Sequence, residues 1–372
     1  MTHNSKILII YDYFYPAYKA GGVTQSLFNL YYSIQNKYSI NIICSNKDLN
    51  NESLLEEKKI EKANYINKFT IIKTLFKMDK KSISHVYLNG IFSPFFFFIP
   101  LLFFKLLYPK IVVVIAPRGM LQKGALEIRS RKKYYYLGVL KVLGLLKNNI
   151  WHATDEQEYE DIKNKIGVNS KISIAPNLPK PPVATLQIIE KEDQVLKLVF
   201  LSLITEMKNL HLILESLKEY NQEVIFDIYG PIKDHAYWDS CKKIITQLPS
   251  NISVTYKGAI EPPFVQQTLQ KYHAMILPSK GENFGHAIYE ALSVGRPVII
   301  SHFTPWNGLD KASAGWNLNL NTNEINDAIN RLQNLSQTDY FRYCQQANQL
   351  AKEYFIKSSN MDNYNKLFKI NN

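Results

Sequence analysis

The stretch Pro278–Pro297, PSKGENFGHAIYEALSVGRP, carries most of the information about the fold of this chain. It follows the apolar run Ala274–Leu277, which is typical of a short buried strand. A polar loop comes next, and a helix is predicted to begin near Gly285. Gly295 and Pro297 mark where that helix should end, because glycine closes many helices and proline cannot continue one. The stretch therefore predicts a strand, a loop and a helix in succession, the repeating unit of a parallel α/β sheet.

Alternation of short β-branched runs with runs of helical period continues over the whole chain. It predicts an α/β protein with two Rossmann-like, doubly wound parallel-sheet domains facing across a cleft, residues 1–178 and 183–354. The proline-rich segment Pro176–Pro182 is expected to join them, and residues 355–372 to form a C-terminal helix packed back on the first domain. The expected strands are Lys6–Phe14, Ser39–Cys44, His85–Asn89, Ile111–Ala116, Ile150–Ala153, Lys171–Ala175, Lys197–Ile204, Val224–Tyr229, Ile252–Tyr256, Ala274–Leu277 and Pro297–Ser301.

The composition describes a basic globular protein. Of its 372 residues, 46% are hydrophobic, which excludes a disordered chain, and the formal net charge is +12. All of the positive excess lies in residues 1–180, which carry 26 basic and 13 acidic side chains. This half is expected to meet an anionic partner, such as a lipid surface, a phosphate-bearing ligand or nucleic acid, or simply to have a basic surface. The three cysteines are far apart, which argues against a disulfide framework or a cysteine zinc site.

Two carboxylates flank the start of the helix predicted in Pro278–Pro297. Glu282 lies on the loop, and Glu290 lies eight residues further on, inside the helix. A carboxylate can accept hydrogen bonds from two vicinal hydroxyls of a sugar, and the unpaired amides at a helix start can receive anionic oxygens. This pair is therefore a candidate site for a ligand with two sugar rings. The alternative is a loop acid and a solvated helix position.

Further motifs lie in both halves of the chain. They are the glycine pair in FYPAYKAGGVTQSL (residues 14–27), APRGML at Ala116–Leu121, WHAT at Trp151–Thr154, APN at Ala175–Asn177 and TPW at Thr304–Trp306. With these motifs, essentially the whole chain resembles the retaining GT-B glycosyltransferases of family 4, the group 1 glycosyltransferases of bacterial surface-polysaccharide clusters. This resemblance implies metal-independent transfer of a hexose-type sugar from a nucleotide-diphosphate sugar to a growing surface glycan such as capsule or O-antigen. It also implies a lipid-linked acceptor and retention of the anomeric configuration.

The resemblance assigns roles in the donor site. It implies that Glu290 holds the nucleotide ribose and that Lys208 grips the donor diphosphate. Glu282 would hold the donor sugar together with the amides that follow it. The expected donor-binding residues are therefore Lys208, Glu282, Asn283, Phe284, Gly285 and Glu290.

The chain departs from the family pattern at Leu203, where the family usually has an arginine five residues before the lysine. One contact to the diphosphate is then missing, which costs about 1.5–3 kcal/mol for a charge-assisted hydrogen bond. Arg118, Lys280 or Lys19 could replace it. An inactive or binding-only relative of the same fold is the alternative.

The first domain is expected to contribute to the site from the ends of its strands. Gly21 and Gly22 lie between the first strand and a helix, where they could contact the acceptor and the donor phosphate or form a plain turn. Arg118 follows the strand Ile111–Ala116, where it could reach the ligand or form a surface salt bridge. We expect Glu282, Lys208 and Arg118 to be the catalytic residues. No D-x-D triplet occurs in the sequence, so neither a metal nor another cofactor is expected.

The membrane is an expected partner, but not through a spanning helix. The N-terminus has no secretory signal, and Pro94, Pro100 and Lys105 interrupt the apolar run Ile91–Tyr108. We expect the phenylalanines of this run to pack on their own sheet. The basic run Arg129–Lys133 and the tyrosines after it are instead expected to touch an anionic bilayer. The predicted location is the cytoplasm, peripheral on the inner face of the cytoplasmic membrane.

Two other functions compete with sugar transfer. A nucleotide-sugar epimerase of the same fold would convert the donor in the absence of an acceptor. A nucleic-acid binder is suggested by the basic first half alone, and no recognised motif supports it, so nucleic acid is not an expected partner.

Overall fold

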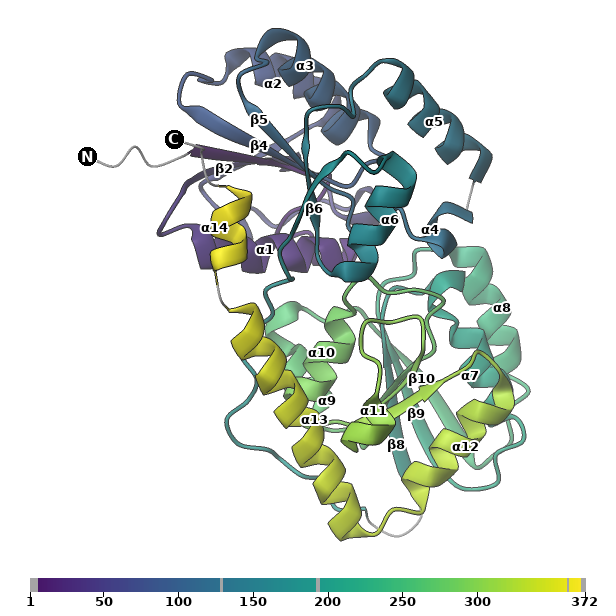
Figure 1. Ribbon diagram of the computed structural model, residues 1–372. Helices are drawn as coiled ribbons and strands as arrows, with labels where there is room; N and C mark the ends of the chain where they lie inside the picture. Colours follow the sequence, from purple (N-terminus) through teal and green to yellow (C-terminus); the bar gives the residue numbers. More distant parts are fainter. Residues whose placement is uncertain (1–5, 128–129, 192–194, 360, 369–372) are drawn as a thin grey trace. The chain divides into compact units, whose positions relative to one another are not determined.

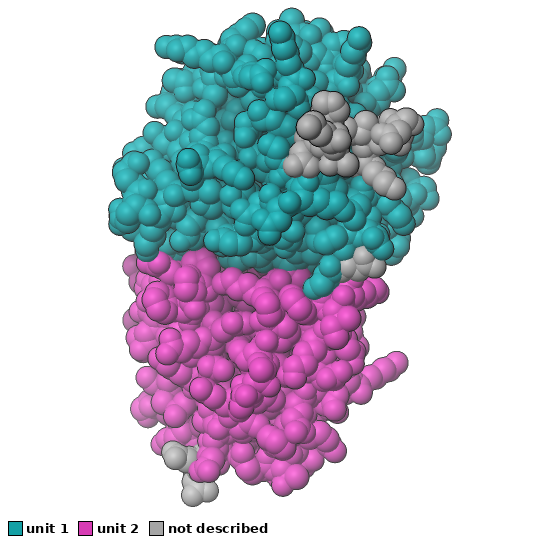
Figure 2. All heavy atoms as spheres, turned by 90° about the vertical axis from the view of Figure 1, so that its left-hand side faces the viewer, with its two compact units in different colours: residues 1–178, 358–372 teal, residues 179–357 magenta. Residues whose placement is uncertain are grey.

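The structure is a computed structural model that describes residues 6–127, 130–191, 195–359 and 361–368. The chain divides into two compact units, shown in different colours in Figure 2. Unit 1 comprises Met1–Leu178 and Ser358–Asn372, and unit 2 comprises Pro179–Lys357. Each unit is built on its own sheet.

Unit 1 contains a seven-stranded parallel sheet in the order β3-β2-β1-β4-β5-β6-β7 (Figure 1). Side chains of β1 alternate between the two faces: Leu8 and Ile10 belong to one apolar core, and Ile7 and Ile9 to the other. Its strands are β1 (Lys6–Ile10), β2 (Ser39–Ser45), β3 (Ala63–Ile66), β4 (Ile83–Asn89), β5 (Val112–Ala116), β6 (Ile150–Ala153) and β7 (Lys171–Ile174).

Helices cover both faces of this sheet. The core on the Leu8 face includes residues of α2 (Ile71–Lys77), α3 (Ile99–Leu107), α5 (Ser130–Val142) and α6 (Glu156–Ile166). The short α4 (Lys123–Glu127) precedes α5. On the Ile7 face, the core includes residues of α1 (Gly22–Ile34) and α14 (Asp362–Leu367). Unit 1 is therefore a sheet between two helical layers.

Unit 2 contains a six-stranded parallel sheet in the order β10-β9-β8-β11-β12-β13. One continuous apolar core surrounds it. The strands are β8 (Leu196–Leu201), β9 (Val224–Tyr229), β10 (Ile252–Gly258), β11 (Ala274–Leu277), β12 (Val298–Ser301) and β13 (Gly315–Leu318). The helices are α7 (Leu210–Leu217), α8 (His235–Ile245), α9 (Val265–Leu269), α10 (His286–Ser293), α11 (Leu309–Ala312), α12 (Thr322–Gln333) and α13 (Gln337–Ser358).

The prediction of two doubly wound parallel sheets is confirmed, but two strands were not expected. These are β3 and β13, and each is an edge strand of four residues. An edge strand has a neighbour on one side only, so it does not need the continuous apolar run that marks a central parallel strand. Helices α2 and α12 were not predicted from the sequence either.

The C-terminal region is two helices. α13 lies in unit 2 except for its last residue, Ser358, where the chain passes into unit 1. α14 follows within unit 1. Tyr364, Leu367 and Phe368 are each about 1% exposed in the core of unit 1. The Tyr364 hydroxyl donates a hydrogen bond of 2.8 Å to the carbonyl of Pro176.

The phenylalanine-rich run is part of the core of unit 1. Phe96, Phe97 and Phe104 are almost fully buried against the sheet, as expected for a helix packed on its own domain. The run begins as a π-helical turn, Pro94–Phe98, and continues as α3. Over the described residues, no helix combines the length and the apolarity needed to cross a bilayer.

Candidate active site

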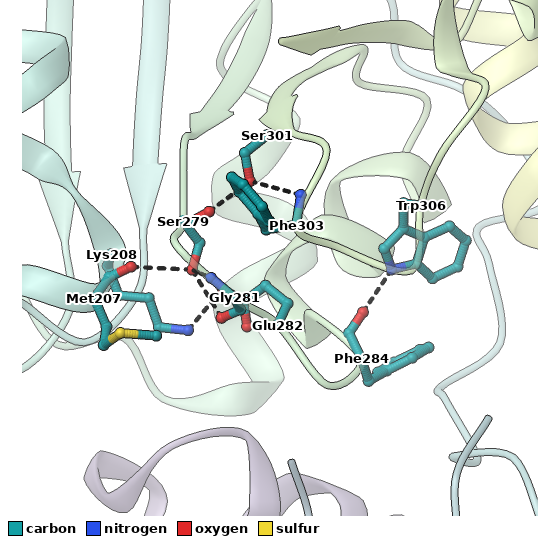
Figure 3. Close-up of polar contacts among 9 residues, drawn as sticks. All are labelled: Met207, Lys208, Ser279, Gly281, Glu282, Phe284, Ser301, Phe303 and Trp306. Atoms are coloured by element: carbon teal, nitrogen blue, oxygen red, sulfur yellow. Dashed lines mark hydrogen bonds and ion pairs between the residues drawn. The ribbon is translucent and has the colours of Figure 1, made fainter. Parts of the chain in front are cut away.

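Two loops of unit 2 are tied together at the carboxyl edge of its sheet (Figure 3). One follows β11 and the other follows β8, and these strands are neighbours in the sheet. The Ser279 hydroxyl lies 3.2 Å from the carbonyl of Met207 and 2.9 Å from that of Gly281. The backbone N–H of Lys280 donates to the same Met207 carbonyl at 2.8 Å. Residues that are more than seventy positions apart are thereby held side by side.

Lys208 and Glu282 form an ion pair between these loops. Lys208 Nζ lies 2.6 Å from Glu282 Oε1, and the two side chains are only 18% and 10% exposed. The left-handed backbone of Asn209 turns the chain from Lys208 into α7. The backbone N–H of Glu282 donates to the carbonyl of Phe303 at 3.0 Å, which fixes its loop against the segment after β12. The structure thus brings together two residues that were predicted separately.

The start of α10 requires glycine. Gly285 precedes the helix with φ of 76°, and a Cβ there would lie 2.8 Å from the Cδ1 atom of Ile288. Gly285 has no side chain with which to cap this eight-residue helix. Asn283 and Phe284 lie on the loop directly before it.

An aromatic cluster supports this loop from behind. Trp306 Nε1 donates a hydrogen bond of 2.6 Å to the carbonyl of Phe284. Its ring lies 5.6 Å from that of Phe284, 6.0 Å from Tyr289 and 5.1 Å from Tyr354. This contact explains the TPW motif, which the sequence could not place. Trp306, the last residue of this motif, holds the loop that carries Glu282 (Figure 3).

Glu290 is buried in α10 with no hydrogen-bond partner for its carboxylate among the described residues. Its side chain is 8% exposed, so the alternative of a solvated helix position is wrong. Burial raises the pKa of its carboxyl to about 7, and Lys180 opposes that rise. An acid held this way loses much of the hydration of its charge without gaining a hydrogen bond from the described residues. Hydroxyl donors of a ligand would supply what the protein does not.

Lys280, one of the candidate replacement cations, lies on the loop after β11 that also carries Glu282. Leu203 is half-buried just beyond the end of β8, so the structure provides no guanidinium there. Lys280 Nζ lies 3.0 Å from Glu206 Oε1, and its backbone is bonded to Met207. Lys19 belongs to unit 1, where it pairs with Glu52 at 2.5 Å.

Gly21 and Gly22 lie where the sequence suggested, between β1 and α1. A short 3₁₀ turn, Tyr18–Ala20, leads to Gly21, whose φ of 100° is one that other residues rarely adopt. Gly22 is exposed at the first position of α1, and no side chain caps that helix. The geometry leaves the helix N-terminus open to an anion.

Arg118 has a role inside unit 1 that sequence reasoning missed. The side chain is 6% exposed, which excludes the alternative of a surface salt bridge. Its Nε donates to Asn89 Oδ1 at 3.0 Å, Nη1 to Asn177 Oδ1 at 3.0 Å, and Nη2 to the Tyr87 hydroxyl at 2.8 Å. All three acceptors are neutral. The catalytic role of Arg118 stays a prediction, while its structural role is to join three segments.

The same network contains the WHAT and APN motifs. The Tyr87 hydroxyl lies 2.5 Å from His152 Nδ1, and His152 Nε2 lies 2.7 Å from the Ala175 carbonyl. Burial, with a contribution from Arg118, lowers the pKa of His152 to about 3, so the imidazole is neutral. Its Nε2 must then donate to the carbonyl, and Nδ1 accepts from tyrosine. The motifs thus share one structural network, which only their positions in space reveal.

Glu158 extends this network to the APRGML motif. Its carboxylate accepts hydrogen bonds from the backbone N–H of Gly119 at 2.6 Å and that of Thr154 at 2.9 Å. Burial raises the pKa of this carboxyl, and these bonds oppose the rise.

The described residues contain no group of three or more His, Cys, Asp or Glu that could hold a metal ion.

Part of the chain matches one protein family, and the whole fold is similar to several solved structures. Residues 185–311 match the family described as Glycosyl transferases group 1, and no curated protein matches the sequence significantly. The fold is similar to sucrose-phosphate synthase from Thermosynechococcus elongatus, with a TM-score of 0.72 and 16% identity over 98% of this chain and 99% of that chain. It is also similar to Anabaena Alr3699/HepE in complex with UDP and glucose, with a TM-score of 0.75 and 14% identity over 98% and 99%. WaaG, a glycosyltransferase involved in lipopolysaccharide biosynthesis, gives a TM-score of 0.66 and 10% identity over 98% and 100%.

These likenesses show the GT-B fold, as the sequence predicted. The matched family region contains Lys208, Glu282 and Glu290, the three residues whose contacts define the candidate site. The fold is thus shared over nearly the whole chain, while the family match is confined to residues 185–311.

Proposed function

We propose that this protein transfers a sugar from a nucleotide-diphosphate sugar to a surface-glycan acceptor, with retention of the anomeric configuration. The observation that carries the proposal is the buried carboxylate of Glu290, which has no hydrogen-bond partner among the described residues and lies in the same loop–helix segment as Glu282, the residue that pairs with Lys208. Sugar hydroxyls suit the two carboxylates, and a diphosphate suits the ammonium. A nucleotide sugar supplies all three groups in one ligand.

Each residue of the donor site has a defined role in this proposal. Glu290 accepts hydrogen bonds from the ribose hydroxyls, which replace the hydration it lost. Lys208 binds the diphosphate and stabilises the negative charge that develops on the leaving nucleotide. Glu282 and the backbone amides from Asn283 to Gly285 bind the donor sugar. With an ammonium and helix amides at hand, the reaction needs no metal and no further cofactor.

The proposed reaction needs no protein nucleophile. The acceptor hydroxyl oxygen forms a bond to the anomeric carbon while the bond from that carbon to the diphosphate oxygen breaks. The hydroxyl proton passes to a phosphate oxygen of the leaving nucleoside diphosphate, so atoms and charges balance. Attack on the same face as departure retains the configuration, as the resemblance implies.

The acceptor side is proposed to lie on unit 1, with Gly21 and Gly22 at the start of α1. A lipid-linked acceptor would explain why the excess positive charge is concentrated in this half. Tyr134 and Tyr135 on α5 are exposed beside the basic residues Arg131 and Lys132, which suits contact with an anionic bilayer. Arg129, part of the same predicted basic run, lies outside the described residues. We therefore propose peripheral association with the inner face of the cytoplasmic membrane.

A donor screen followed by a product assay tests the proposal. UDP-, GDP- and TDP-sugars are compared by thermal shift, because a ligand that binds the folded state raises the unfolding temperature. Release of nucleoside diphosphate is then measured with and without a lipid-linked saccharide mixture. Acceptor-dependent release supports sugar transfer. Conversion of the donor without acceptor would indicate an epimerase, and binding without any turnover would indicate a binding-only protein.

A further inference from the structure

A groove of about 1200 Å³ lies in unit 1 at the amino ends of three strands. Val112, Ile150 and Lys171, the first residues of β5, β6 and β7, line it. In a parallel sheet, the amino ends of the strands lie on the edge opposite their carboxyl ends. Gly21 and Gly22 follow the carboxyl end of β1. The groove is therefore separate from the part of unit 1 proposed to meet the sugar substrates.

The groove is strongly basic. It is lined by Lys141, Lys147, Lys171 and Lys366, all exposed, and none of the described residues that line it is Asp or Glu. The dipole of a helix favours a cation at its C-terminal end, which accounts for Lys141 on α5 and Lys366 on α14. It does not account for Lys147 in a loop or Lys171 on a strand. Four cations from four segments converge on one groove, and an anion would relieve their mutual repulsion.

Exposed aliphatic side chains lie next to these lysines. Val142, which directly follows Lys141, is 88% exposed, and Leu143 is also exposed. Together they form an apolar end of α5 beside a basic groove. Water-soluble anions gain nothing from such side chains, whereas the acyl region of a membrane does.

A second aliphatic pair reaches the groove from α3. Lys105 Nζ donates hydrogen bonds of 2.8 Å and 3.1 Å to the carbonyls of Lys147 and Asn148, both of which line the groove. These bonds hold the end of α3, with the exposed Leu106 and Leu107, beside the groove. The apolar side chains thus come from two helices.

We propose that this groove binds the phosphate group of an anionic membrane lipid while the aliphatic side chains beside it enter the acyl region. Phosphate matches the cluster of ammonium groups, and the two aliphatic pairs select an amphiphile over a free ion. The inference deepens the membrane association proposed above and rests on it. It adds a defined headgroup site at the end of α5 opposite the exposed tyrosines.

Vesicle flotation of the full-length chain tests this site. The variant K147Q/K171Q removes the two lysines that helix dipoles do not explain. The matched control K243Q/K271Q removes two exposed lysines from unit 2, so both proteins have the same net charge. Vesicles of phosphatidylcholine alone are compared with vesicles that also contain phosphatidylglycerol. Nucleotide sugar is omitted, and donor binding is measured separately by thermal shift, so failure of this site and failure of the sugar-transfer proposal are distinguishable.

The wild type and K243Q/K271Q should float with the phosphatidylglycerol vesicles. K147Q/K171Q should bind them roughly 30-fold more weakly, from about 1 kcal/mol for each lysine near an anionic surface. Equal binding by both variants would overturn the proposal. So would stabilisation of the wild type, but not of K147Q/K171Q, by inorganic pyrophosphate without vesicle binding, because the ligand would then be a soluble phosphate.

Discussion

Replacing Glu290 by glutamine should make the ligand-free protein more stable at neutral and alkaline pH. The carboxyl is buried without a hydrogen-bond partner among the described residues, and burial raises its pKa from 4.5 to about 7. Glutamine has nearly the same size and no charge to desolvate. The substitution therefore removes the cost of keeping a bare carboxylate in the interior while it leaves the packing of α10 unchanged.

The size of the effect follows from the pKa. A carboxyl whose pKa is raised by folding binds its proton more tightly in the folded state, so ionisation between pH 4.5 and about 7 reduces stability. The rise of about 2.5 pH units corresponds to about 3–4 kcal/mol, at about 1.4 kcal/mol per unit. The full difference between E290Q and wild type should be present above pH 7. It should shrink as the pH falls toward 4.5.

Two measurements check this prediction. Guanidinium unfolding, followed by tryptophan fluorescence, gives the stability of both proteins at pH 8 and at pH 5. Binding of the nucleotide sugar found by the donor screen gives the second readout, because ribose hydroxyls need the ionised carboxylate as acceptor. Wild-type affinity should fall roughly tenfold from pH 8 to pH 6, as protons compete for Glu290. E290Q should bind more weakly at pH 8 and lack this pH dependence.

The reasoning fails if E290Q is less stable than the wild type at pH 8. That result would show that the carboxylate has a stabilising partner in the folded protein. A stability difference that is the same at pH 5 and pH 8 would likewise show that the charge of Glu290 is not its cause. Donor affinity that E290Q leaves unchanged would remove the ribose role.

Two further predictions concern Lys208 and Arg118. K208Q should weaken nucleoside diphosphate binding about 10- to 150-fold, from about 1.5–3 kcal/mol for a charge-assisted hydrogen bond, when measured by calorimetry. K218Q breaks the half-buried Lys218–Glu215 pair of 2.8 Å and should bind like the wild type; equal effects of the two substitutions would contradict the diphosphate role. R118K should destabilise unit 1 by about 2–4 kcal/mol, because one ammonium cannot reach all three buried acceptors. The transition reported by Trp151 should shift accordingly, whereas R331K, at an exposed pair with Asp310, should change stability by less than about 1 kcal/mol.

The fold could be predicted largely because central parallel strands have a strong signature. β1 and β11 are short apolar runs, and the residues of β1, β4 and β11 are almost all buried. The helices between strands have the expected period. β3 and β13 escaped prediction because each is a four-residue edge strand that includes an asparagine. The break between α13 and α14 also escaped, since both segments have helical composition.

The candidate site was predictable only where one segment contains its parts. Glu282 and Glu290 could be found because they flank a single helix start. The pairing of Lys208 with Glu282 depends on two loops meeting in space, which spacing along the chain does not reveal. Arg118 shows the same limit more strongly, because its acceptors Tyr87, Asn89 and Asn177 come from separate places in the sequence. In the sequence, a basic residue that follows a strand has the same pattern whether its side chain binds a ligand or bonds to buried polar side chains.

The packing of α14 into unit 1 has a consequence for synthesis on the ribosome. Residues 1–178 emerge first, yet Tyr364 and Phe368, which close one face of their core, emerge only after all of unit 2. At roughly 5–20 residues per second, the intervening segment takes on the order of ten seconds or more to translate. During that interval the part of the apolar face that α14 covers stays exposed in nascent unit 1, so it is the stage at which chaperones have most to protect.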